Sequence, residues 1–118
     1  MTGPGPGERR EGKGDGEGEA PAGPEGRLVG RRWVLKGRVQ GVGFRWFVLN
    51  HAQALGVRGW VRNMEDGAVE VVALAEAATI DRLDARLAAG PPGAHVVEVV
   101  RDDIPHELVE GKSFRIRH

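Results

Sequence analysis

One short stretch governs how this chain is interpreted, and it reads Gly37-Arg38-Val39-Gln40-Gly41-Val42-Gly43-Phe44-Arg45. It starts at the end of an alternating apolar run and finishes where a helical pattern opens. Glycine tolerates positive φ angles and lets other groups approach the backbone closely. A glycine-rich turn between a strand and a helix can therefore direct several N–H groups, and the positive end of the helix dipole, at one point. Arg45 adds a planar guanidinium suited to phosphate oxygens. The stretch predicts an oxyanion pocket, most suited to a phosphoryl group.

Two common phosphate-binding motifs do not fit this stretch. The dinucleotide fingerprint requires a third glycine where the chain has Trp46. The Walker motif requires Gly-Lys-Ser/Thr, which does not follow. From the residues alone, a tight strand-to-helix turn followed by a surface arginine stays open as the alternative.

Three motifs resemble those of the acylphosphatase family. Residues 36–45 are similar to the family's signature loop, and Gly59-Trp60-Val61-Arg62-Asn63 followed by Asp66-Gly67 is similar to its second signature. Gly90-Pro91-Pro92 stands where the family has a Gly-Pro turn after its second helix. The likeness runs from about Arg32 to His118.

This resemblance implies a ferredoxin-like fold and an enzyme, an acylphosphatase, that hydrolyses the carboxyl-phosphate bond of small acyl phosphates. In family members the arginine that matches Arg45 binds the phosphoryl oxygens. The residues expected to bind the substrate's phosphate are Gln40, Gly41, Val42, Gly43, Phe44 and Arg45. Arg45 and Asn63 are the expected catalytic residues. We expect no cofactor and no metal, and we expect a monomer.

The chemistry of acyl phosphates agrees with this set of residues. The leaving group is a carboxylate, which is stable without a proton, so water attack at phosphorus needs no general acid. Catalysis can rest on holding the phosphoryl group and orienting one water molecule. The amide of Asn63 can accept a hydrogen bond from that water.

Each of these residues also has a structural interpretation. Arg45 could form a salt bridge, and Asn63 could hydrogen-bond to backbone at a strand end. Gln40 could support the loop or reach the site, and loop support is favoured. Trp46, Phe47 and Trp60 are expected to be packing residues. The arginines expected on solvated strand faces are Arg38, Arg58 and Arg62.

Composition divides the 118-residue chain into two parts. Residues 1–26 hold nine of the nineteen glycines and four of the seven prolines, with no Val, Ile, Leu or aromatic residue. Such a segment cannot bury enough apolar surface to offset its ordering entropy, so we predict that it is disordered. Residues 27–118 are predicted to form one acylphosphatase-like domain.

Charge and cysteine content exclude further classes of function. Residues 1–26 carry three basic and six acidic side chains, a net charge of −3, and the whole chain is neutral, so residues 27–118 carry +3. That charge suits a small anionic ligand but is weak for nucleic acid, which favours a clustered basic face. The chain has no cysteine, so thiol catalysis and disulfides are excluded. No run approaches the roughly 18 apolar residues of a membrane span. A cytoplasmic protein without nucleic-acid or membrane partners is the default expectation.

Periodicity predicts the elements. Alternation indicates strands over residues 32–39, 57–63, 68–74 and 95–103, with a short one at 113–117, and Asp66-Gly67 is typical of a hairpin turn. In the fourth run, Val97 and Val99 are expected to face one way. Helices are predicted for residues 44–55, with Phe44 and Val48 inward, and for a segment ending at Gly90. This order, β-α-β-β-α-β with a short C-terminal strand, predicts an α+β split-βαβ fold. In such a fold an antiparallel sheet carries both helices on one face.

Two rival functions have sequence features of their own. Residues 43–48 have a passing likeness to the aromatic RNA-binding motif of RRM domains, whose aromatics lie on a central strand. The second rival is a non-catalytic anion-binding module, like the similar domains built into larger carbamoyl-transferring proteins. The four histidines show no metal-ligand spacing.

Overall fold

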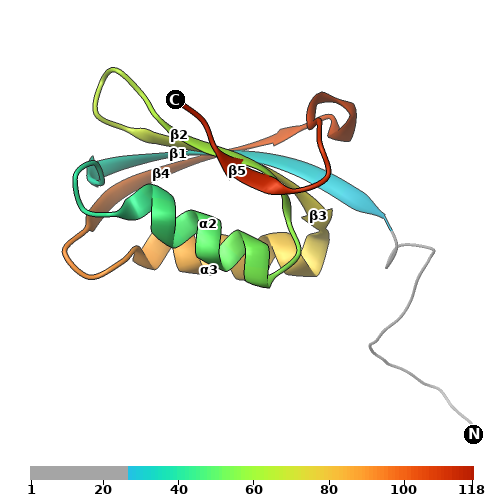
Figure 1. Cartoon of the computed structure of the whole chain (residues 1–118), viewed down its shortest axis with the longest axis horizontal. Coiled ribbons are helices and arrows are strands. Elements are labelled where there is room, and N and C mark those ends of the chain that lie inside the picture. Colours follow the sequence, from blue (N-terminus) through green and yellow to red (C-terminus); the bar gives the residue numbers. More distant parts are fainter. Residues whose placement is uncertain (1–26) are drawn as a thin grey trace, which may run out of the picture.

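The computed structural model describes residues 27–118, and the segment predicted to be disordered, 1–26, lies outside the described residues. The elements follow in the order β1 (Leu28–Arg38), α2 (Phe44–Ala54), β2 (Arg58–Asn63), β3 (Val69–Glu76), α3 (Ala77–Ala89), β4 (His95–Ile104), the 3-10 turn η2 (His106–Leu108) and β5 (Phe114–Ile116). This order confirms the predicted split-βαβ arrangement with a short last strand. Both helices lie against one face of the sheet (Figure 1).

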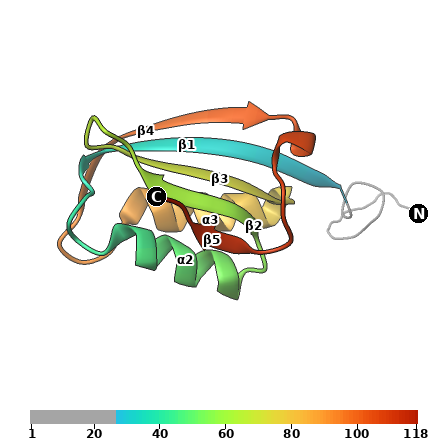
Figure 2. The same ribbon diagram turned by 45° about the horizontal axis from the view of Figure 1, so that its top comes forward.

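The sheet has the strand order β4-β1-β3-β2-β5 (Figure 2). Three of its pairs are antiparallel, as predicted, but β5 runs parallel to β2. The chain leaves β4 at one edge of the sheet and passes through η2 to the other edge. It therefore enters β5 in the direction of β2, and the sheet is mixed at that edge.

The hydrophobic core lies between the sheet and the two helices. The strands contribute Trp33 and Leu35 from β1, Val61 from β2 and Val71 from β3, all fully buried. The helices contribute the buried residues Phe44, Val48, Ala52, Ile80, Leu83 and Leu87. Phe44 and Val48 point inward from a helix, as predicted, so the aromatics of residues 43–48 do not lie on a central strand as in RRM domains.

The predicted faces of β4 were wrong at two positions, because Val97 was expected to face the same way as Val99 and Val96 the opposite way. Val96 and Val99 both pack against the core, whereas the side chain of Val97 is 65% exposed. The cause is an irregularity in the pairing with β1, where Lys36 opposes Glu98 and Gly37 opposes Val96, so that Val97 has no partner. Such an inserted residue reverses the alternation of side chains.

Gly37 allows this close pairing of β1 and β4. Its φ is 128°, and a Cβ added there would lie 2.2 Å from the carbonyl oxygen of His95. Only glycine can therefore hold the end of β1 against β4. The chain leaves the sheet two residues later, at the buried Val39.

The other face of the sheet carries a buried carboxylate. Glu70 is 5% exposed and forms ion pairs with Arg32 and Arg62. Burial alone would raise the pKa of Glu70, but hydrogen bonds and charges from the two arginines outweigh it and hold that pKa below its usual value. Arg62, expected to be a solvated residue, is therefore paired.

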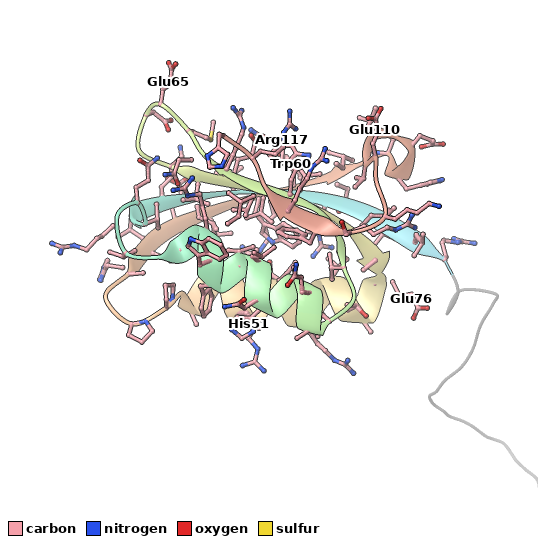
Figure 3. All side chains as sticks on the ribbon, viewed as in Figure 1. His51, Trp60, Glu65, Glu76, Glu110 and Arg117 are labelled. Atoms are coloured by element: carbon pink, nitrogen blue, oxygen red, sulfur yellow. The ribbon has the colours of Figure 1, made fainter. Side chains whose placement is uncertain are left out.

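Trp60 lies on this same face, next to the ion pairs. Its ring packs against a small cluster of Val72, Leu74 and Val109, which confirms its packing role. The guanidinium of Arg117 stands over the indole, 4.5 Å from the ring centroid. Figure 3 shows the two side chains together on the side away from the helices.

Candidate active site

The loop that joins β1 to α2 is shaped by two left-handed glycines. Gly41 and Gly43 both have a φ of 77°, and a Cβ at either would meet nothing within 4 Å. Backbone conformation, and not crowding, therefore requires glycine at both positions. Gly43 is also the N-cap of α2, and its carbonyl accepts the first helical hydrogen bond, from the N–H of Phe47 at 3.0 Å.

The N–H groups of this loop remain available. Within residues 27–118, no oxygen accepts a hydrogen bond from the backbone N–H of residues 41–46. Gly41 and Gly43, which carry two of these donors, are exposed to solvent. The N–H groups at the start of α2 are also where the helix dipole is positive. The arrangement can receive an anion.

Gln40 ties the loop to the β2–β3 turn. Its side-chain Nε2 donates to the carbonyl oxygen of Met64 at 2.8 Å and to that of Ala68 at 2.9 Å. Both amide protons are thus used in holding two loops together, which is the supporting role favoured from the sequence. Its side chain has no proton left to donate to a ligand.

The turn itself has the predicted hairpin chemistry. The N–H of Met64 donates to Ala68, and the carboxylate of Asp66 accepts from the N–H of Ala68 at 3.0 Å. Gly67 has a φ of 95°. This turn, the β1–α2 loop and the α3–β4 connection all lie at one end of the molecule (Figures 1 and 2).

Asn63 is the last residue of β2 and sits beside the turn. It pairs with Val69 and is half-buried. Because side chains alternate along a strand, it lies on the same face as the buried Val61, toward the helices. Among residues 27–118 its side chain has no hydrogen-bond partner, so the backbone-bonding alternative finds no support there.

Arg45 stands in the first turn of α2 and is half-buried. Among residues 27–118 no carboxylate lies within salt-bridge distance of its guanidinium, so the salt-bridge alternative also finds no support there. Phe44, just before it, is buried against the α3–β4 connection: a Cβ at Gly90 would lie 3.2 Å from its ring. The buried Phe44 anchors the turn that carries Arg45.

A cavity of about 380 Å³ opens beside Arg45, between α2 and β5. From α2 it is lined by Arg45, Trp46, Leu49 and Gln53. From β5 and the residues after it, the lining is Phe114, Arg115, Ile116 and His118. The lining contains two arginines and no Asp or Glu side chain. The cavity therefore combines apolar walls with positive charge.

Trp46 was expected to be a packing residue, and this was wrong, because 63% of it is exposed. Trp46, Leu49 and Gln53 follow a helical spacing that forms a second stripe beside the buried stripe of α2. The short strand at 113–117 was predicted from the sequence, but its position beside this stripe of α2 was not. Phe47, by contrast, packs against the core as predicted.

The described part of the chain shows neither a metal cluster nor a membrane helix. Within residues 27–118, no three His, Asp or Glu side chains gather in a way that could hold a metal ion. Among the same residues, no helix is long and apolar enough to cross a membrane.

The sequence model of the family described as Acylphosphatase matches residues 31–116. This chain belongs to the acylphosphatase family. An acylphosphatase of Acaryochloris marina (strain MBIC 11017) is 43% identical over 83 residues, which cover 70% of this chain and 87% of the relative.

Solved acylphosphatase structures share the fold of this family member. The structure from Coxiella burnetii matches with a TM-score of 0.69 at 38% identity and covers 76% of this chain and 93% of its own. The structure from Bacillus subtilis matches with a TM-score of 0.71 at 32% identity and covers 76% and 99%. The ferredoxin-like architecture expected from the resemblance is thereby confirmed.

Proposed function

We propose that this chain hydrolyses the carboxyl-phosphate bond of small acyl phosphates to a carboxylate and inorganic phosphate. Membership of the acylphosphatase family supports the reaction class. The observation that carries the proposal at the site is the β1–α2 loop. Between Gln40 and Trp46 the chain offers backbone N–H donors that no oxygen of residues 27–118 uses, and Arg45 is part of this stretch.

In this proposal the phosphoryl group binds to the loop. The N–H groups of Gly41 to Phe44 donate to its oxygens, and Arg45 adds charge-assisted hydrogen bonds. Gln40 contributes through its place in the loop, since its side-chain protons are bound to the β2–β3 turn. Preorganised donors of this kind stabilise the charge on the equatorial oxygens during phosphoryl transfer.

Asn63 then orients the attacking water. It lies at the same end of the sheet as the loop and on the face toward α2. Its amide oxygen accepts a hydrogen bond from one O–H of the water while the water oxygen attacks phosphorus and the P–O bond to the acyl group breaks; that O–H stays on the phosphate product. The water's other proton passes to an oxygen of the substrate's phosphoryl group, because an amide is not a strong base. The acyl carboxylate leaves without protonation.

The test is hydrolysis of benzoyl phosphate in the presence of a chelator, with phenyl phosphate as the comparison. The chain should release phosphate from the acyl phosphate without added metal and leave the monoester intact. A monoester has a poorer leaving group, and the proposed site supplies no acid to protonate it. Phosphate binding without turnover would instead identify a non-catalytic anion-binding module and would contradict the proposal.

A further inference from the structure

The cavity between α2 and β5 adjoins Arg45 but is not lined by residues 40–44, whose loop is proposed to hold the phosphoryl group. Its volume of about 380 Å³ is within the range of small-molecule sites. Two of its walls are apolar: Leu49 on α2 and Ile116 on β5, both partly buried against the core. Phe114, 3% exposed, closes the floor. A ligand held at Arg45 would extend into this space.

Trp46 is the unusual member of the lining. Large aromatic side chains contribute most to the stability of a fold when they are buried, yet 63% of Trp46 is exposed to solvent. It is held at the first turn of α2, directly after Arg45, so its position relative to the phosphate loop is determined by the helix backbone. Its indole offers a flat apolar surface at the mouth of the cavity.

We propose that this cavity is the acyl-group subsite and that Trp46 makes it selective for acyl phosphates with a large, flat, aromatic acyl group. The inference rests on the proposed function, since it assumes that the phosphoryl group binds at Arg45. An aromatic acyl group would stack on the indole and contact Leu49 and Ile116. A two-carbon acyl group would not reach these residues.

Charge narrows the class of acyl group. Arg45 and Arg115 line the cavity, and no Asp or Glu side chain does. Within residues 27–118, Arg115 forms no ion pair. The subsite is therefore suited to neutral or negatively charged aromatic acyl groups and disfavours cationic ones.

The experiment compares kcat/KM for benzoyl phosphate and acetyl phosphate in the intact chain and in Trp46→Ala. Because Trp46 is mostly exposed, its removal should leave the fold unchanged. Loss of its apolar contact should lower kcat/KM for benzoyl phosphate ~10-fold and that for acetyl phosphate less than ~2-fold. The control is Leu108→Ala, which removes an equally exposed apolar side chain (66%) from η2, outside the cavity. An equal loss for both substrates, or no loss for either, would overturn the subsite.

A binding measurement separates this inference from the proposed function. Benzoylphosphonate, which cannot be hydrolysed, should bind more tightly than acetylphosphonate by calorimetry, and Trp46→Ala should abolish the difference while inorganic phosphate binds unchanged. If the chain hydrolyses neither acyl phosphate but this difference in affinity is found, the function fails and the subsite stands. If both substrates are hydrolysed and Trp46→Ala leaves the affinity difference intact, the subsite fails and the function stands.

Discussion

At the scale of single residues, the proposed mechanism assigns phosphoryl binding to a charged side chain and water positioning to a neutral amide. Arg45 follows the glycine loop, and Asn63 ends the neighbouring strand β2. A guanidinium can hold a phosphoryl group in both ground and transition states, whereas an amide that positions water acts only when water attacks. Truncating Arg45 and truncating Asn63 should therefore change phosphate affinity and turnover in different ways.

We expect Asn63→Ala to lower kcat on the order of 10²–10³-fold, the usual effect of removing one preorganised hydrogen-bonding group. Inhibition by inorganic phosphate should stay unchanged, because the loop and Arg45 still bind it. The measurement is steady-state kinetics with benzoyl phosphate and phosphate as inhibitor. Asn50→Ala, an exposed asparagine of α2 outside the cavity, serves as the control. Normal turnover in Asn63→Ala would remove the water-positioning role.

We expect Arg45→Ala to lose both turnover and phosphate affinity, because the same group binds the oxygens before and during the reaction. The same kinetic and inhibition assays measure this. Arg82→Ala removes an exposed arginine from α3 and should leave both quantities unchanged. A variant that keeps its phosphate affinity would show that the loop amides suffice and that Arg45 has another role.

The glycines of the loop make a prediction about stability. Gly43→Ala should destabilise the fold by ~1–2 kcal/mol, the cost of a left-handed conformation for a residue with a Cβ. Gly43→Asn should cost less, because asparagine tolerates that conformation. Denaturant unfolding measures both. Gly59→Ala should be far worse, since its Cβ would lie 1.9 Å from the carbonyl oxygen of Val72. Equal losses of stability in Gly43→Ala and Gly59→Ala would contradict the prediction that only conformation, and not crowding, requires glycine at Gly43.

At the scale of elements, one side chain couples the β1–α2 loop to the hairpin that carries Asn63. Gln40 donates to Met64 and Ala68, and those two carbonyls also accept backbone bonds within the turn. Removing the glutamine therefore leaves neither acceptor without a partner. Removing the Gln40 side chain should change the relative placement of the loop and the turn more than it changes the stability of the whole fold.

We expect Gln40→Ala to cost ~1–2 kcal/mol of stability, the sum of two ordinary hydrogen bonds, and to lower kcat for benzoyl phosphate ~10-fold or more through misplacement of Asn63. Gln40→Glu should be worse, because its carboxylate would face two carbonyl oxygens. Denaturant unfolding and kinetics measure the two effects. A stability loss with unchanged kcat would show that the coupling has no part in the reaction.

Helix α3 illustrates a second coupling between elements. The buried indole of Trp33 donates to Asp84 at 2.8 Å, and Arg101 of β4 donates to the same carboxylate at 2.6 Å. The hydrogen bond from Arg101 is the main reason that the pKa of Asp84 lies below its usual value, since it outweighs the effect of burial. The two partners of Asp84 come from two different strands, β1 and β4.

At the scale of the whole molecule, two carboxylates with lowered pKa values make stability depend on pH. For Glu70 and Asp84 the folded state binds protons less readily than the unfolded chain. Their contribution is therefore complete above the unfolded pKa values of about 4 and is lost as pH falls through the lower folded values. The ion pairs thus stabilise the fold near neutral pH and not in acid.

We expect the free energy of unfolding to fall as pH drops below ~4, and Glu70→Gln should reduce that slope because one of the two groups no longer titrates. Urea unfolding between pH 7 and pH 2 measures it. The control is Glu98→Gln, an exposed glutamate of β4 that has no ion pair within residues 27–118. A slope identical to that of the intact chain in Glu70→Gln would show that the buried pair does not contribute.

What the sequence by itself determined was local. Backbone conformation within one segment accounts for the glycines at positions 41 and 43 and for the hairpin before Val69. Side-chain spacing within one segment accounts for the change from strand to helix periodicity and for the inward face of α2. For that reason the order of elements and the placement of Gln40 agree with the structure. The roles of Arg45 and Asn63 in catalysis stay predictions.

Only the tertiary structure decided the features that join distant segments. Four features depend on which strand lies beside which. They are the parallel pairing of β5 with β2, the extra residue at Val97, the burial of Glu70 between two arginines and the exposure of Trp46 over a cavity. A residue's own spacing indicates which face it occupies but not what covers that face. The covering is set by the packing of the whole sheet and its two helices.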